Sequence, residues 1–346
     1  MADEPEISEQ NFRDLCEQLE AVVSMAEEAG VVNQVEIGDC CVQLGALTNV
    51  LEEDPQIPIQ WFTRAIEIYD QTVEATDPRL LRPLCELAMI EIRDDELESA
   101  ISKVYQIHEI LRSDAGRQVL DDNPDLATGF YTIEGFIERK HGRNREAAVC
   151  FDRAYATAER YLDPDSPEWV QLLANQAISR QDLDDHATAK KLLERAIAIL
   201  EERLGTDHPD RPLFLSGLAT SEQMLGNHER ARQLFEQVLA LESGKTERME
   251  EPDIGVALTC HNLAEVEQSL GRLPEAVAYS RRAFRILFDL DHELAEDELK
   301  WLARNDPDFD TFMRNLKAEL AAEAECEDEG RYEDENENED GDRDGT

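Results

Sequence analysis

Several residue types are scarce in this sequence of 346 amino acids. Aromatic residues make up only 6% of the chain, and lysine occurs 7 times against 27 arginines. The 34 basic residues face 79 acidic ones, which leaves a formal net charge of −45 at pH 7. A surface this negative repels the phosphates of nucleic acids and of anionic membranes, so we expect neither as a partner. A charge-selected protein or peptide partner would be basic.

Long apolar runs and an even set of cysteines are also missing. No stretch approaches the ~18 consecutive apolar residues of a membrane-spanning helix, and the acidic start MADEPEISEQ lacks the apolar centre of a signal peptide. The cysteines form no CxxC pair and no cluster with histidine. They are Cys16, Cys40, Cys41, Cys85, Cys150, Cys260 and Cys326. An odd number of thiols, mostly at apolar positions of helical patterns, indicates a reducing compartment, so we expect a cytoplasmic protein without disulfides or a metal site.

Motifs of catalysis are absent as well. The sequence contains no glycine-rich phosphate loop, no HExxH and no GxSxG. One stretch, LGTDHPD at 204–210, places Asp207, His208 and Asp210 between two apolar runs. Pro209 cannot continue a helix, and aspartates suit turn and capping positions. We interpret the stretch as a hinge between helices rather than an active site, and we expect no enzyme activity and no cofactor.

What the sequence does contain is an internal repeat. In REAAVCFDRAYATAERYL (145–162) a small, a large and a small residue share one helical face as Ala147, Phe151 and Ala154. Five more trios have the same spacing. They are Pro58–Phe62–Ala65, Ala100–Val104–Ile107, Ala189–Leu193–Ala196, Ala231–Phe235–Val238 and Ala276–Ser280–Ala283. Successive trios lie 42, 47, 42, 42 and 45 residues apart, which indicates an array of repeated units.

A second marker keeps the same step. A small residue stands twelve positions before each trio, at Ala46, Ala88, Gly135, Ala177, Ala219 and Ala264. Glycines at 142, 226 and 271 occupy equivalent turn positions, and prolines recur between the units. We interpret each unit as two helices joined by a tight turn. The small residue begins the first helix in this interpretation and allows close packing.

These units resemble tetratricopeptide repeats, specifically the 42-residue kind found in kinesin light chains. The trios, the preceding small residues, the turn glycines and AIAILEERLGTDHPD (196–210) carry the resemblance over about residues 36–290. The match is weaker over 36–110, where Pro58 replaces the usual alanine and the turn glycine is missing. The extra residues of the third unit fall in RSDAGRQVLDDN (112–123), which we predict to be a loop extension.

The resemblance implies an all-α fold, a right-handed α-solenoid of about six helical hairpins with a capping helix or helices at each end. We divide the chain into an N-terminal capping helix within 1–35, the repeat array at 36–290, C-terminal capping helices at 291–320 and a tail at 321–346. The segment 12–30 has the apolar spacing of an amphipathic helix. The tail contains 13 acidic and two basic residues, so we expect it to be disordered.

The resemblance also implies a concave groove, lined by the first helix of each unit, that takes an extended peptide or a partner helix. Members of the family often place an asparagine two residues before the small residue, where it hydrogen-bonds the ligand backbone. Asn175 and Asn262 occupy that place here, whereas Ile133 and Gly217 stand there in two other units. The other residues expected to contribute to binding in the groove are Phe136, Arg139, Ile178, Gln181, Thr220, Gln223, His261 and Glu265.

Two charge patterns add further hypotheses. Glu91, Glu138, Glu222 and Glu267 each stand three residues after a small residue, and we interpret this acidic row as a binding-surface feature. The segment ERKHGRNRE (138–146) is a basic island in an acidic chain. It suggests that the acidic tail docks there, and the alternative is ordinary surface charge that salt screens.

Together these patterns favour a protein–protein interaction scaffold that binds a peptide or a helical segment of a partner and performs no chemistry. The alternative is a peptide-sensing regulatory module whose curvature changes when a ligand binds. Neither the oligomeric state nor the identity of a partner is encoded in these patterns.

Overall fold

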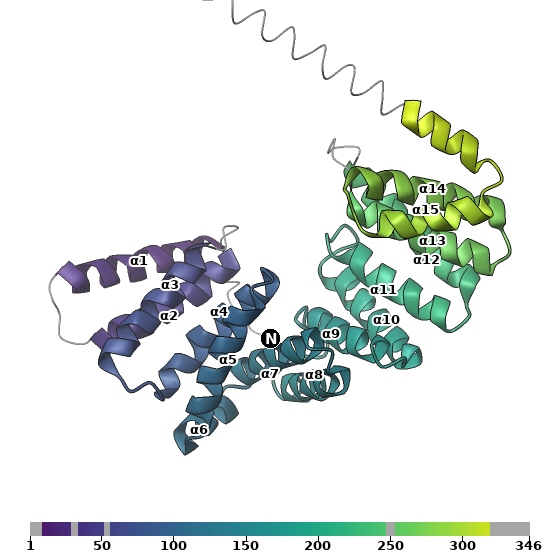
Figure 1. Ribbon diagram of the computed structural model, residues 1–346. Helices are drawn as coiled ribbons and strands as arrows, with labels where there is room; N and C mark the ends of the chain where they lie inside the picture. The colour runs from purple at the N-terminus through teal and green to yellow at the C-terminus, as the bar shows by residue number, and fades with distance from the viewer. Residues whose placement is uncertain (1–8, 29–33, 52–55, 247–252, 319–346) are drawn as a thin grey trace, which may run out of the picture. The chain divides into compact units, whose positions relative to one another are not determined.

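The computed structural model describes residues 9–28, 34–51, 56–246 and 253–318, and these residues are helical with no strand among them (Figure 1). The predicted acidic tail at 321–346 lies outside the described residues. The helices are α1 (Glu9–Glu28), α2 (Gln34–Leu51), α3 (Gln56–Thr72), η1 (Pro78–Leu80), α4 (Leu81–Arg93), α5 (Leu97–Leu111), α6 (Asp114–Asp122), α7 (Pro124–Lys140), α8 (Asn144–Ala158), α9 (Trp169–Gln181), α10 (His186–Arg203), α11 (Arg211–Met224), α12 (His228–Thr246), α13 (Ile254–Ser269), α14 (Leu273–Asp289) and α15 (Leu294–Asn305). A last, unlabelled helix runs over 309–318.

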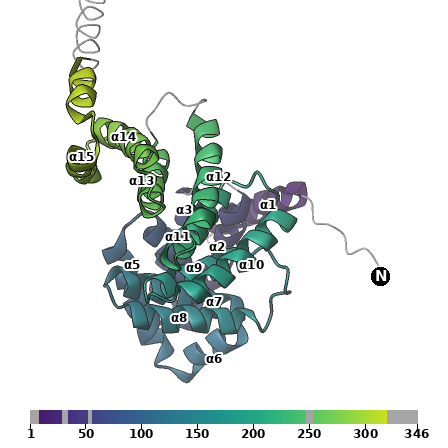
Figure 2. The same cartoon turned by 90° about the vertical axis from the view of Figure 1, so that its right-hand side faces the viewer.

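The helices pack as hairpins within two compact units, Met1–Gly217 and Leu218–Thr346. In the first unit α2 packs on α3, α4 on α5, α7 on α8 and α9 on α10. In the second unit α13, α14 and α15 lie side by side (Figures 1 and 2). These pairs coincide with the predicted repeat units, and the predicted all-α solenoid class is confirmed.

The trios form the contact between the two helices of each hairpin, since every member of all six trios is buried. Gly135 on α7 faces Phe151 on α8 so closely that an added Cβ would lie 2.6 Å from the ring. The small residue stands in the middle of the first helix and does not begin it, so that expectation was wrong. The first helix has to extend on both sides of the contact because its two ends also carry packing residues.

The first hairpin differs from the predicted register by one residue. Ala46 is only half-buried, whereas Gly45 is buried and an added Cβ there would lie 2.6 Å from the ring of Phe62. Gly45 therefore takes the place that the twelve-residue spacing assigned to Ala46. In this hairpin the small residue in contact therefore stands thirteen positions before Pro58, one more than in the other units.

The N-terminal helix α1 packs on the first hairpin along a narrow line. Cys16 and Val23 are buried in the core of the first unit, and Leu19 lies against it. Leu15 and Val22 are exposed, although the apolar spacing of the sequence included them, and Met25 is exposed as well. The apolar stripe of α1 is therefore wider than the part that the hairpin covers.

The segment 112–123 is not a loop extension, as the sequence suggested, but contains the nine-residue helix α6. Ser113 caps this helix, since its Oγ accepts a hydrogen bond from the Gly116 N–H at 2.9 Å. Gly116 lies against the carbonyl of Ile110, where an added Cβ would be 2.3 Å from the oxygen. Leu120 is buried in the core of the first unit. A cap and one buried leucine are enough to order this insertion as a helix.

In the five hairpins whose turns are described, from α4–α5 to α13–α14, the turn ends the first helix in the same way. A backbone N–H bonds the carbonyl five residues earlier, and the residue before that N–H has a positive φ, as in a Schellman motif. The N–H to carbonyl pairs are Glu96 to Glu91, Arg143 to Glu138, Asp185 to Arg180, Asn227 to Glu222 and Arg272 to Glu267, at 2.7–2.9 Å. Gly142, Gly226 and Gly271 hold the positive-φ position as predicted, and Asp95 and Asp184 hold it where glycine is missing.

LGTDHPD is the predicted hinge. It joins α10 to α11 through Gly205, whose φ is +95° and whose N–H bonds the Leu200 carbonyl at 3.0 Å. The imidazole of His208 accepts a hydrogen bond from the Asp210 N–H at 3.3 Å, so the histidine supports the turn.

The trio contact predicts a site-specific effect on stability. Ala196 is fully buried on α10, and Ala196→Glu should lower the free energy of unfolding by several kcal/mol, on the order expected for a buried carboxylate without a partner. Ala198 on the same helix is exposed, so Ala198→Glu should unfold at nearly the parental urea concentration. Equal unfolding midpoints for the two variants would contradict the assigned contact.

The turns predict a stabilising change. Asp184 has a φ of +60°, and Asp184→Gly should raise the free energy of unfolding by about 0.5–1 kcal/mol because glycine adopts this conformation without a Cβ clash. Asp184→Ala removes the same negative charge and keeps the Cβ, so it should give no gain in urea unfolding. If the alanine variant gained as much as the glycine variant, relief of charge repulsion would be the cause instead.

Candidate binding surface on the first helices

The first helices of consecutive hairpins contact one another inside each unit. In the first unit α4 packs on α7, and Arg82 of α4 donates a hydrogen bond to Asp125 of α7 at 2.6 Å. We call the exposed and half-buried residues of α7 and α9 in the first unit, and of 218–224 and α13 in the second, the first-helix surface. All ten residues predicted to bind a partner belong to it.

In the first unit two of these residues tie one hairpin to the next. Arg139 of α7 donates from Nε to Asp182, beyond the end of α9, at 2.5 Å. Gln181 of α9 donates from Nε2 to the backbone carbonyl of Gly217 at 2.8 Å. These side chains therefore bond to neighbouring repeats, which reduces the polar groups that they offer to a ligand.

Phe136 and Ile178 supply the apolar part of the first-helix surface in this unit. Both are half-buried. The ring of Phe136 meets that of Phe151 edge-on, with centroids 5.5 Å apart, and this contact fixes its orientation. Their exposed edges form a small apolar part of the first-helix surface.

In the second unit Gln223 joins one first helix to the next, as Gln181 does in the first unit. Its Nε2 donates to Glu265 of α13 at 3.2 Å. One step further, Trp301 of α15 donates from its indole N–H to Gln268 of α13 at 3.0 Å. Thr220 is half-buried on α11. Amide and carboxylate side chains thus link successive first helices in both units, which sequence spacing alone did not reveal.

His261 belongs to a polar cluster between α13 and α15. Its Nδ1 is hydrogen-bonded to the buried carboxylate of Glu298, and the other oxygen of Glu298 accepts from the hydroxyl of Ser280 on α14. The Glu298 hydrogen bond raises the pKa of His261 above its ordinary value, while burial opposes the shift, and the charges of Glu298, Glu265 and Asp297 add to it. Through Glu298 and Ser280, His261 thus links α13, α14 and α15.

Asn175 and Asn262 differ from these neighbours. Both are half-buried on first helices, at the position two residues before the small residue. Neither makes a hydrogen bond to another residue in the described part of the chain. Each therefore presents an amide, one donor group and one acceptor, that is not used by the fold.

The acidic row is not a binding surface, contrary to the interpretation from the sequence. Glu222 and Glu267 are buried, and three of the four carboxylates pair with the side chain five residues further on. The pairs are Glu138 with Arg143 at 2.9 Å, Glu222 with Asn227 at 2.7 Å and Glu267 with Arg272 at 3.5 Å. Glu91 instead pairs with Lys103 and accepts from Ser99 on α5. Glu138, Glu222 and Glu267 thus clamp the turns of their hairpins, and Glu91 joins the two helices of its hairpin.

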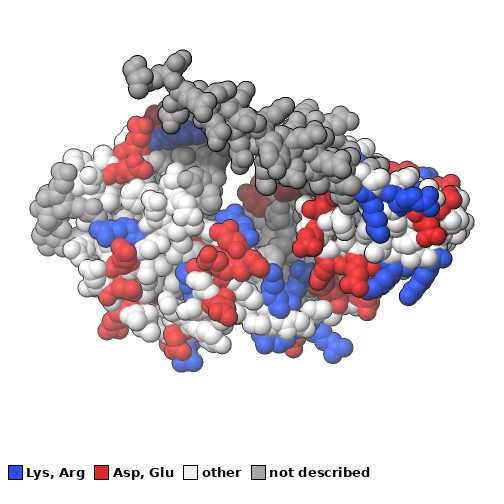
Figure 3. Space-filling view, turned by 45° about the horizontal axis from the view of Figure 1, so that its top comes forward, with Lys and Arg blue, Asp and Glu red and all other residues white. Residues whose placement is uncertain are grey.

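The basic island at 138–146 is largely neutralised by its neighbours. Arg139 bonds Asp182, Lys140 bonds Asp95 at 2.5 Å, and Arg143 bonds Glu138. Three of its four cations are therefore paired within the fold, which removes the charge that suggested tail docking there. On the face shown in Figure 3, Lys and Arg side chains likewise lie among Asp and Glu side chains.

The thiols and histidines do not gather into a reactive site in the described residues. Burial raises the pKa of the Cys260 thiol to about 11 and that of Cys150 to about 11, so both stay protonated at neutral pH. No group of three or more His, Cys, Asp or Glu within the described ranges is placed to hold a metal ion. The side chain of His186 is mostly buried beside Asp184. None of the helices described is long and apolar enough to cross a membrane.

Comparison with known proteins agrees with this architecture. Two family models, both described as tetratricopeptide repeat, match residues 169–241 and 256–287. The chain therefore contains tetratricopeptide repeats at these residues. A search of curated protein sequences finds no match.

Solved structures show the same fold at low sequence identity. BtubC (BKLC) from P. vanneervenii is 18% identical with a TM-score of 0.50, over 75% of this chain and 91% of that one. A Rap protein complexed with competence and sporulation factor is 17% identical with a TM-score of 0.53, over 86% of this chain and 77% of that one. A weaker similarity, with a TM-score of 0.46, links the chain to repeats of a putative kinesin light chain from Podosopora anserina, which are 23% identical over 62% of this chain and 98% of that one.

The His261 cluster predicts a pH-dependent stability. Because the folded-state pKa of His261 is raised, its contribution is fully present below the unfolded pKa of about 6.5 and is lost as pH rises through the folded value. Urea unfolding from pH 6 to 9 should therefore show a decline in stability that His261→Gln reduces. His141→Gln, which changes an exposed histidine in the first unit, should keep the decline. A decline of equal size in all three proteins would exclude His261 as its source.

Proposed function

We propose that this protein is an interaction scaffold whose first-helix surface binds an extended peptide or a helical segment of a protein partner. The observation that supports the proposal is that some polar side chains of this surface are bonded to neighbouring repeats and others are not. Arg139, Gln181 and Gln223 are bonded to neighbouring repeats, whereas Asn175 and Asn262 are not bonded within the described chain.

An asparagine amide matches the chemistry of a peptide backbone. Its NH2 group donates to a ligand carbonyl and its oxygen accepts from a ligand N–H, which gives two bonds independent of ligand sequence. Because neither Asn175 nor Asn262 has to break an internal bond first, each amide only has to release its water before it bonds a ligand. Half-buried Phe136 and Ile178 lie on the same surface in the first unit and would favour an apolar ligand side chain.

The fold and its relatives support this class of function. Repeat arrays use their extended first-helix surfaces for binding, and the Rap structure of the same fold holds a separate factor. The net charge of −45 favours basic over acidic segments on most of the surface. We propose no catalysis and no cofactor. The peptide-sensing alternative stays a hypothesis drawn from the sequence.

The proposal predicts that partner capture depends on the two asparagines. Proteins retained from a lysate on the immobilised full-length chain at about 0.15 M salt should bind about fivefold more weakly after Asn175→Ala or Asn262→Ala, the loss expected for one or two hydrogen bonds. Quantitative mass spectrometry of the retained proteins gives the measurement.

The matched control is Asn49→Ala. Asn49 is an exposed asparagine on the first helix α2, away from the position of Asn175 and Asn262, so this change should not alter capture. Circular dichroism melts would show that all three variants stay folded. Retention that survives both asparagine changes, or that disappears with salt for every variant, would refute binding through the first-helix surface.

A further inference from the structure

A pocket of about 290 Å³ opens in the first unit beside helix α6. Its apolar lining comes from four helices, with Val42 on α2, Tyr69 on α3, Val119 on α6 and Leu126 on α7. Tyr69 and Leu126 are buried, whereas Val42 and Val119 are only half-buried. We call this hollow the α2–α6 pocket. Because α6 belongs to the insertion at 112–123, the repeat pattern alone does not supply this wall of the pocket.

The charged side chains at the rim of the α2–α6 pocket are used by the fold. The pairs are Asp39 with the Tyr69 hydroxyl at 2.6 Å, Arg82 with Asp125 at 2.6 Å and Arg79 with Asp77 at 3.1 Å. A charged ligand group would have to compete with these partners for hydrogen bonds. An apolar group displaces only water from the valines and the tyrosine ring, and its burial is favourable. The lining therefore selects an apolar group.

Gln43 adds an amide that the fold does not use. It lines the α2–α6 pocket, is exposed on α2, and makes no hydrogen bond to another residue in the described part of the chain. Gly45 is the small residue that contacts the second helix of this hairpin, so Gln43 stands two residues before it. Asn175 and Asn262 stand at the same place in their own hairpins. The register predicted from the sequence put Leu44 there instead, which is why the sequence did not reveal this third amide.

The size of the pocket limits what can enter it. Its 290 Å³ equals the volume of about ten water molecules at liquid density and lies at the lower end of the range for ligand sites. One large side chain and part of its backbone fit, but a segment of several residues does not. In an extended peptide successive side chains point to opposite sides. One residue can therefore enter the pocket while its backbone meets Gln43, and its neighbours stay outside.

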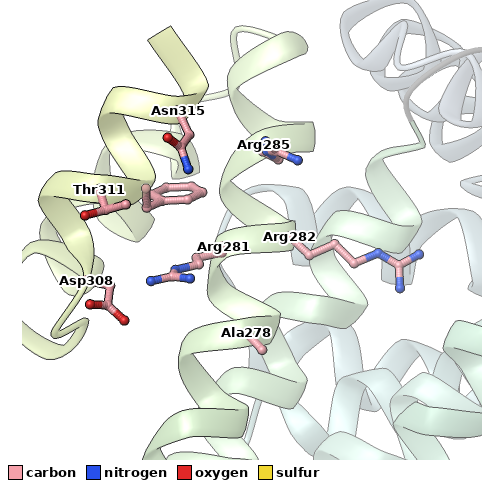
Figure 4. A pocket seen from close by; sticks show the side chains of 8 residues that line it. Ala278, Arg281, Arg282, Arg285, Asp308, Thr311 and Asn315 are labelled. Carbon is pink, nitrogen blue, oxygen red and sulfur yellow. The ribbon is translucent and has the colours of Figure 1, made fainter. Parts of the chain in front are cut away.

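A larger hollow in the second unit, about 650 Å³ between α14 and the helix at 309–318, has a different character (Figure 4). Figure 4 shows Arg281 pointing toward the helix that carries Thr311, whereas Arg282 points away from it. Arg281 donates two hydrogen bonds to the buried carboxylate of Asp306, and its guanidinium lies 5.2 Å from the ring centre of Phe312. These contacts fasten the last helix to α14, so we assign this hollow to helix packing and not to a ligand.

We propose that the α2–α6 pocket binds one large aliphatic side chain of the peptide segment and that the Gln43 amide bonds the backbone beside that side chain. This mode of binding rests on the proposed function, and it extends the binding surface from α7 and α9 to the first hairpin. It also makes binding selective, because an amide forms the same backbone bonds with every ligand sequence. The net charge of −45 attracts basic segments in general, and the pocket selects those with an aliphatic residue at the anchoring position.

A titration of the full chain with blocked amino acids tests the pocket directly. N-acetyl-leucinamide carries one aliphatic side chain between two amide groups, so it mimics a single residue of a bound peptide. In methyl NMR spectra of valine- and leucine-labelled protein, it should shift the signals of Val42, Val119 and Leu126 in a saturable way. A Kd in the millimolar range is expected for a ligand of this size. N-acetyl-glycinamide and N-acetyl-lysinamide should leave these signals unchanged, and equal shifts with either compound would overturn the proposal.

Two variants separate the contribution of the pocket from that of the amide. Val42→Phe fills the pocket with a ring and should abolish the saturable shifts of the remaining methyl signals. Gln43→Ala keeps the pocket open and should raise the Kd of N-acetyl-leucinamide about threefold, the loss expected for one hydrogen bond. The matched control Asn49→Ala changes another exposed amide of α2 and should leave the Kd unchanged.

The outcomes that contradict the proposal are equally specific. Binding of N-acetyl-leucinamide that survives Val42→Phe would overturn it, and so would equal Kd values for Gln43→Ala and Asn49→Ala. Circular dichroism melts would show that each variant stays folded. Because Gln43 is exposed, Gln43→Ala keeps the test informative even if the larger side chain at position 42 destabilises the chain.

Lysate capture distinguishes failure of the pocket from failure of the proposed function. Asn175 and the pocket both belong to the first unit, so proteins whose retention falls with Asn175→Ala should also be retained several-fold less by Val42→Phe. If Asn175→Ala releases these proteins and Val42→Phe does not, the pocket proposal is wrong and the scaffold function is retained. If Asn175→Ala, Asn262→Ala and Val42→Phe all leave retention unchanged, both proposals are refuted.

Discussion

The close contact between a small residue on one helix and the middle residue of a trio on the next sets the geometry of each hairpin. Where the small residue is glycine, as at Gly135 and Gly45, an added Cβ would clash with the facing ring at 2.6 Å. Close packing of this kind fixes the distance and the register of the two helices together. Once register is fixed, the turn, the first-helix positions and the interval to the next hairpin follow, which is why markers on different helices share one period.

The excess of acidic residues has a structural role inside this frame. Glu138, Glu222 and Glu267 clamp turns, and Asp152 of α8 accepts bonds from Gln176 and Arg180 of α9 at 2.5–2.8 Å. The preference for arginine over lysine fits these contacts, because a guanidinium binds both oxygens of one carboxylate, as Arg281 does with Asp306. Part of the negative charge is therefore neutralised locally, and net charge alone describes the surface poorly.

Sequence reasoning succeeded where a residue's role depends on its own helix and failed where it depends on another segment. The trios, the turn glycines and the hinge at 204–210 follow from helical periodicity and backbone preference, and the structure has them. Helix α6 was missed because its order comes from the Ser113 cap and from Leu120 meeting a core that local pattern does not show. The turn role of Asp184 could have been predicted from the sequence. Asp184 stands where other units have the turn glycine, and aspartate tolerates a positive φ better than most residues.

The candidate binding surface shows the same contrast between what a residue's own helix determines and what a neighbouring repeat determines. Arg139, Gln181 and Gln223 were correctly assigned to the first helices, but their bonding partners lie 36–43 residues away in the next repeat. A side chain on the inner face of a repeat array has two competing uses, joining adjacent repeats and binding a ligand, and a hydrogen bond spent on the first is lost to the second unless the ligand replaces it. The residues that can give such an array its ligand are those left over by its own assembly, and on the first-helix surface Asn175 and Asn262 meet that condition.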